Sequence, residues 1–188
     1  LAISLEMNVR KFISLISTYL ALLMLGQTAQ QVPMSIESLT TKADAVVHGK
    51  VTSITCKSDA TGRIFSVISL NLIEIIKGQR KSMNFELVHG GGILGSKRSG
   101  SLVDPKFKVG EEIVVFVVYN SRGEAIPLAQ NQGRFEVFRS QGLNAVMVRN
   151  PFHGSPQPND PSIVIKRASG RYPLTLNELK RRIRRVNK

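Results

Sequence analysis

Two long strand patterns constrain the fold of this chain more than any other feature. Residues 43–56 (ADAVVHGKVTSITC) and residues 64–76 (IFSVISLNLIEII) are rich in β-branched and apolar residues, and the turn cluster at residues 57–62 (KSDATG) separates them. In both patterns the apolar residues change from one face of the strand to the other partway along. Such a change predicts bulged, strongly bent strands, which allow a small sheet to close on itself.

The alternation of apolar residues shows where each change falls. Val47 and Val51 share one face of the first pattern, whereas Ile54 lies on the other. In the second pattern the change comes near Leu72. Gly49 lies within the first pattern, where a glycine is typical of a bulge.

Shorter strand patterns follow, without long helices between them. Residues 83–89 alternate, and residues 113–119 (IVVFVVY) are continuously apolar, which is typical of a strand buried on both faces. Residues 134–139 and 143–149 flank a loop that contains Gly142, so they predict a hairpin. The series predicts an all-β fold, a small closed or partly open Greek-key barrel of the OB-fold type, with a β-sandwich as the alternative.

A short helix is expected ahead of the strands, at residues 35–41 (SIESLTT). Ser35 is its expected N-cap, and Ser38 and Thr40 are expected on its solvent-exposed side. The barrel domain, including this helix, is expected to occupy residues 30–150.

Residues 1–29 have the three-part order of a secretory signal peptide. Arg10 and Lys11 precede the apolar stretch at residues 12–25, and small residues lead to a cleavage site after Ala29. The apolar stretch is shorter than the ~20 residues of a transmembrane helix. These features predict an exported protein, periplasmic or extracellular.

Cys56 is the single cysteine of the chain. One cysteine cannot form an internal disulfide or a cysteine-rich zinc module. Because Cys56 lies at the end of an apolar strand pattern, we expect a buried, unreactive thiol.

The strands also carry a resemblance to known proteins. The segment at residues 43–55 (ADAVVHGKVTSIT), with Lys77 and Gly78 closing the second pattern, is similar to the netrin-module and TIMP-like OB-fold proteins. The run from Ala43 to Val137 resembles uncharacterised secreted bacterial proteins with the same pattern. The residues that carry this second resemblance are Phe107, Val109, Gly110, Glu111, Val114, Phe116, Gln132, Gly133, Phe135 and Val137.

The resemblance implies an OB-type fold and, as an alternative function, regulation of a secreted protease. TIMP-like inhibitors bind the metal of their target through an N-terminal cysteine. The exported chain would begin near Gln30 and has no such cysteine, so that inhibitory mechanism is not expected here.

A glycine-rich segment at residues 90–95 (GGGILG) matches the dinucleotide-binding pattern in form. The residues that follow contain Gly100 and Pro105 and do not predict a helix, so no dinucleotide or other cofactor is expected. We expect a flexible connection between strands. The alternative is a small anion-binding nest made by Lys97, Arg98 and the glycine amides.

His48, His89 and His153 are far apart in the sequence, and none has a second ligand at the spacing of a metal motif. His48 is expected to face solvent, and His89 to continue the inward face of its strand beside the glycine-rich segment. Glu111 and Glu112 are adjacent on a strand, so they point to opposite faces. No nucleophile, base and orienting group come together, and we predict neither a metal site nor an enzyme.

The C-terminal segment concentrates positive charge. The chain has 26 Lys and Arg against 13 Asp and Glu, and residues 166–188 hold nine of these cations with Glu178 as the single acid. A Pro-rich linker is expected ahead of this segment, at residues 151–165. Thr175 and Glu178 form a capping box for an amphipathic helix. The apolar stripe of this helix is Leu176, Leu179, Ile183 and Val186, and its cations are Lys180, Arg181, Arg182, Arg184 and Arg185.

Two interpretations of this helix are open at this point, and both can hold together. It can dock its apolar stripe on the barrel, or its cations can contact an anionic polymer, an anionic lipid surface or a secreted protein. These cations, with Lys97 and Arg98, are the candidate anion contacts. We predict an exported, non-enzymatic binding domain whose basic tail contacts an anionic envelope or extracellular partner, and we expect no sequence-specific nucleic-acid binding.

Overall fold

The computed structural model describes residues 32–79, 84–100, 104–140, 144–154 and 173–187. The predicted signal peptide and most of the predicted linker lie outside the described residues. The elements are α2 (Ile36–Lys42), β1 (Ala45–Ser58), β2 (Ile64–Lys77), β3 (Asn84–Gly90), β4 (Gly92–Leu94), β5 (Lys97–Ser99), β6 (Glu112–Tyr119), β7 (Ala125–Pro127), the 3-10 helix η2 (Gln130–Gly133), β8 (Arg134–Ser140), β9 (Ala145–Arg149), β10 (Leu174–Thr175) and α3 (Leu176–Val186).

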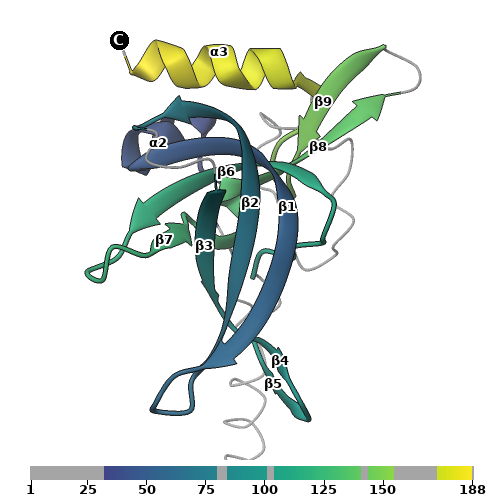
Figure 1. The fold of residues 1–188 in the computed structure, drawn as a ribbon. Coiled ribbons are helices and arrows are strands. Elements are labelled where there is room, and N and C mark those ends of the chain that lie inside the picture. Colours follow the sequence, from purple (N-terminus) through teal and green to yellow (C-terminus); the bar gives the residue numbers. More distant parts are fainter. Residues whose placement is uncertain (1–31, 80–83, 101–103, 141–143, 155–172, 188) are drawn as a thin grey trace, which may run out of the picture. The chain divides into compact units, whose positions relative to one another are not determined.

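Five strands close into a barrel in the order β1-β2-β3-β7-β6, and β6 pairs back onto β1 to complete the circle (Figure 1). Neighbouring strands run antiparallel except β3 and β7, which pair in parallel at Leu87 and Ala125. β8, β9 and β10 extend the sheet from β6 outside the circle. The predicted small, closed β-barrel is confirmed, in place of the β-sandwich alternative.

Bulges bend β1 and β2 where the apolar pattern changes face. In the pairing of these two strands, Thr52 of β1 and Ile73 and Ile76 of β2 are extra residues with no opposite residue, and Thr52 and Ile73 lie at the predicted changes of face. The strands also approach closely, because a Cβ atom at Gly49 would lie 2.8 Å from the carbonyl oxygen of Asn71. The two changes of face predicted from the sequence are therefore confirmed as bulges.

Two hydrophobic cores share the barrel wall. The inner core fills the barrel and includes Leu70 and Val115, and the outer core packs α2 and α3 against the wall and includes Phe116 and Leu179. β6 contributes to both cores because alternate side chains of a strand point to opposite faces. The apolar strand predicted at residues 113–119 is β6, and its predicted burial on both faces is confirmed.

α2 begins as predicted but buries more of its surface than predicted. The Ser35 Oγ caps it by accepting a hydrogen bond from the Ser38 N–H at 3.1 Å. The prediction that Thr40 faces solvent is wrong, since this side chain is fully buried and its hydroxyl donates to the Ile36 carbonyl. α2 packs against both β6 and α3, so a second face of the helix is covered.

α3 docks on the outer core through its apolar stripe. The Thr175 Oγ accepts a hydrogen bond from the Glu178 N–H at 3.1 Å, which confirms the predicted cap. Leu179 and Ile183 are fully buried. Val186, the last residue of the helix, is 37% exposed, so the buried stripe is one residue shorter than predicted.

The fold continues past the start of the predicted linker. Phe152 is buried, and the His153 Nε2 lies 2.8 Å from the Met34 carbonyl oxygen. The Asn150 Oδ1 accepts hydrogen bonds from the backbone N–H groups of both Phe152 and His153. Residues 151–154 are therefore part of the same folded unit as the barrel.

We expect Ile183→Ala to lower the free energy of unfolding by about 2–5 kcal/mol, because it leaves a cavity in the outer core. Val186→Ala, at the exposed end of the same helix, should change it by less than about 1 kcal/mol. Urea unfolding followed by circular dichroism measures both. Equal effects of the two substitutions would show that this stripe does not hold α3.

Candidate functional site

Most of the cations on α3 form ion pairs with carboxylates. The Lys180 Nζ donates to the Glu74 Oε2 of β2 at 2.6 Å. Arg182 makes two hydrogen bonds, of 2.7 and 2.8 Å, to the carboxylate of Glu37 on α2. These pairs tie α3 to two other elements, so the cations that the sequence predicted as anion contacts help to dock the helix.

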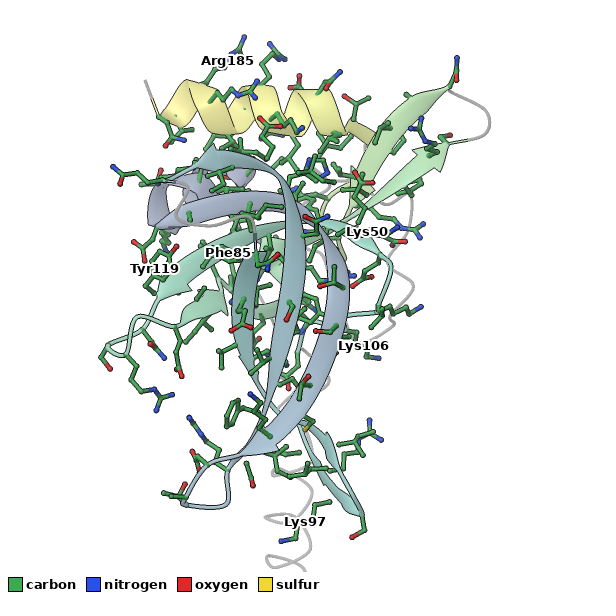
Figure 2. All side chains as sticks on the ribbon, viewed as in Figure 1. Lys50, Phe85, Lys97, Lys106, Tyr119 and Arg185 are labelled. Atoms are coloured by element: carbon green, nitrogen blue, oxygen red, sulfur yellow. The ribbon has the colours of Figure 1, made fainter. Side chains whose placement is uncertain are left out.

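The remaining α3 cations are more exposed. Arg184 also reaches Glu74, and Arg181 pairs with Glu178 within the helix. Arg185 has no carboxylate partner among the described residues, and it lies on the outer side of the helix (Figure 2). Four of the five cations thus meet three carboxylates, which leaves a modest positive excess on this surface.

These pairs shift the pKa values of the two acids that receive α3. Burial of the Glu74 carboxyl opposes its ionisation, but hydrogen bonds and charge from Lys180 and Arg184 outweigh burial and hold its pKa below the usual 4.5. The hydrogen bonds from Arg182 lower the pKa of Glu37 in the same way. Both pairs therefore stabilise the fold above about pH 4.5 and lose that contribution as the pH falls.

A pocket of about 420 Å³ opens at the end of the barrel where the β4–β5 hairpin is attached. Its walls are mostly apolar, and its polar groups come from β2, β3, β5 and the segment that leads to β6. Its lining includes Ile54, His89, Ile93, Arg98, Asp104, Lys106 and Phe107. In Figure 1 this hairpin lies at the opposite end of the barrel from α3.

The glycine-rich segment forms the turn from β3 into the hairpin, and the strand β4 follows it instead of a helix. A Cβ atom at Gly92 would lie 2.6 Å from both the Cys56 Sγ and the Ser66 Oγ, so a side chain at this position would collide with β1 and β2. The Gly91 N–H donates to the Ile64 carbonyl at 3.0 Å. This amide is therefore occupied and does not contribute to the anion-binding nest considered as an alternative.

The hairpin places the two predicted cations of this region differently. Arg98 lines the pocket. Lys97 is the first residue of β5 and lies next to the exposed tip of the hairpin (Figure 2). Lys106 joins Arg98 in the pocket wall. The sequence reasoning missed Lys106 because nothing in its local pattern distinguishes it from any other surface lysine.

His89 lines the pocket, next to the glycine-rich segment as predicted. Its Nε2 is 4.0 Å from the Asp104 Oδ2, and its ring lies 6.3 Å from that of Phe107 in a tilted arrangement. Burial lowers the pKa of His89, and the Asp104 carboxylate opposes this only in part. His89 is therefore neutral at pH 7, so the positive charge of the pocket comes from Arg98 and Lys106.

The prediction that His48 faces solvent is wrong. His48 is buried, because the outer core covers the face of β1 opposite Val47. Its Nε2 lies 2.7 Å from the Glu112 Oε1. Glu111 turns instead to Arg134, so the two adjacent carboxylates have different partners, as expected.

Cys56 is half-buried, and so less enclosed than predicted. It lies beneath the attachment of the hairpin, where its sulfur faces Gly92. No group of three His, Cys, Asp or Glu side chains among the described residues could hold a metal ion.

Comparison with known proteins does not assign this fold to a family. No protein-family model and no curated protein match the chain. The resemblance to netrin-module proteins stays a prediction. In the part of the chain that the structure describes, no helix is long and apolar enough to cross a membrane.

We expect Glu74→Gln to lower the free energy of unfolding by about 1 kcal/mol at pH 7, because it removes the acceptor shared by Lys180 and Arg184. Glu178→Gln removes a more exposed pair within the helix and should change it by less than about 0.5 kcal/mol. Urea titrations at pH 7 and pH 3 measure both. Because Lys180 and Arg184 hold the pKa of Glu74 below its usual value, the contribution of these pairs is lost as the pH falls, so a Glu74→Gln effect that is equally large at pH 3 and pH 7 would contradict the assigned ion pairs.

Proposed function

We propose that this chain is an exported, non-enzymatic binding module that contacts an anionic envelope or extracellular surface through the cations at the pocket end of the barrel. The observation that carries this proposal is a difference in ion pairing between two groups of cations. Those on α3 are largely engaged with carboxylates, whereas Lys97, Arg98 and Lys106 form no ion pair with a described residue. Unpaired cations are available to an anionic partner without first breaking an internal contact.

The surroundings of these cations support the same proposal. Arg98 and Lys106 lie in a concave, mostly apolar wall, and binding sites combine apolar walls with a few polar groups in this way. The Arg134 guanidinium lies 5.5 Å from the centre of the Phe107 ring and pairs with Glu111. Phe107, which lines the pocket, thus packs against a guanidinium that is itself held by an ion pair.

α3 takes a secondary role in this proposal. Its exposed cations add to the net charge of +13, which attracts an anionic surface at long range. The pattern of residues 1–29 supports export, which would bring the barrel to such a surface.

The test is retention of the chain from Gln30 onward on an anionic polymer, across a salt series. We expect Lys97→Gln, Arg98→Gln and Lys106→Gln together to weaken binding about 100-fold, at roughly 1 kcal/mol for each cation. Substitution is preferable to removal of α3, because Leu179 and Ile183 are buried in the outer core and removal of the helix would expose the apolar residues they cover.

The matched control is Lys42→Gln, Lys50→Gln and Arg139→Gln, which removes the same charge from exposed positions elsewhere. We expect a loss several-fold smaller than that of the pocket-end variant. Equal losses would mean that net charge alone drives binding. Absence of salt-sensitive binding by the unsubstituted protein would overturn the proposal.

A further inference from the structure

Exposed aliphatic side chains gather on the same end of the barrel as the unpaired cations. Ile93 is 67% exposed and Leu94 is 36% exposed, both on β4, and Ile54 of β1 is 38% exposed. Ile54 and Ile93 both line the pocket, so they lie on one continuous surface. An exposed apolar cluster beside cations is a feature of surfaces that bind partners or membranes.

The pairing of the hairpin mixes these two kinds of side chain. Ile93 pairs with Arg98, and Leu94 pairs with Lys97. Residues directly opposite each other in a strand pair share a face, so each face of the hairpin presents one aliphatic side chain and one cation. The tip is a two-residue turn in which Gly95 has a φ of 60°.

We propose that the β4–β5 hairpin is a membrane-surface anchor that inserts Ile93 and Leu94 into the boundary between headgroups and acyl chains of an anionic bilayer. Lys97 and Arg98 then lie at the level of the headgroup phosphates. This inference rests on the proposed function and specifies its partner as anionic lipid. It also sets an orientation, with the hairpin end of the barrel toward the membrane and α3 at the other end (Figure 1).

The aliphatic side chains favour a lipid surface over a soluble polyanion. A soluble polyanion can pair with Lys97 and Arg98 but offers no apolar environment to Ile93 and Leu94. A bilayer provides both, because basic side chains bind anionic headgroups and aliphatic ones enter the region beneath them. The hairpin lies at the exposed end of the barrel, with Lys97 at its tip, so it can reach a flat surface (Figure 2).

The test compares two partners, vesicles of phosphatidylglycerol with phosphatidylcholine and soluble dextran sulfate. We expect Ile93→Ser with Leu94→Ser to weaken vesicle binding about 10- to 100-fold and to leave dextran sulfate binding unchanged. The control is Ile73→Ser with Val109→Ser, which removes two side chains that are 54% and 64% exposed elsewhere. The control should leave both affinities unchanged.

A second readout reports insertion directly. The chain has no Trp, so Leu94→Trp introduces a single indole at the hairpin. Its fluorescence emission should shift to shorter wavelength with anionic vesicles and not with dextran sulfate. An unshifted emission on vesicles that bind the protein would overturn the anchor.

The outcomes separate the two proposals. Salt-sensitive binding to both partners that is indifferent to Ile93 and Leu94 overturns the anchor and leaves the proposed function standing. Absence of salt-sensitive binding to either partner overturns the proposed function, and the anchor with it.

Discussion

The burial of both faces of β6 is the constraint on which the rest of this structure depends. One face of the strand fills the barrel and the other supports the outer core, and its backbone pairs with β1, β7 and β8. A strand in this position cannot present polar side chains on either face, which is why Ile113–Val117 is continuously apolar. The outer core, which includes Leu179 of α3, and the inner core therefore share this strand.

The small number of acids shapes the surface. The chain has 13 acids for 26 Lys and Arg, and two of the acids, Glu37 and Glu74, receive α3. Carboxylates that dock the helix neutralise part of the positive charge on α3. At the pocket end, Lys97, Arg98 and Lys106 form no ion pair with another described residue. Local charge density in the sequence therefore differs from available charge on the surface.

The fold could be predicted from the sequence because its main elements are encoded locally. The bulges in β1 and β2 follow from changes of face in their own patterns, and the cap of α3 follows from Thr175 and Glu178. Predictions failed where burial depended on distant elements. His48 and Thr40 were expected in solvent, yet the outer core and the packing around α2 cover them. Alternation identifies the two faces of an element but not how many of them are covered.

The candidate site, like the fold, could be predicted only in part from local sequence patterns. The sequence by itself determined the barrel, the apolar stripe of α3 and the presence of Lys97 and Arg98 beside a glycine-rich segment. Only the tertiary structure decided which cations are paired, because Lys180 meets Glu74 and Arg182 meets Glu37 across separations of 106 and 145 residues. It also decided that Lys106 and Phe107 join Arg98 in one pocket. Ion pairing and pocket formation depend on distances between elements, and local sequence patterns carry no information about those distances.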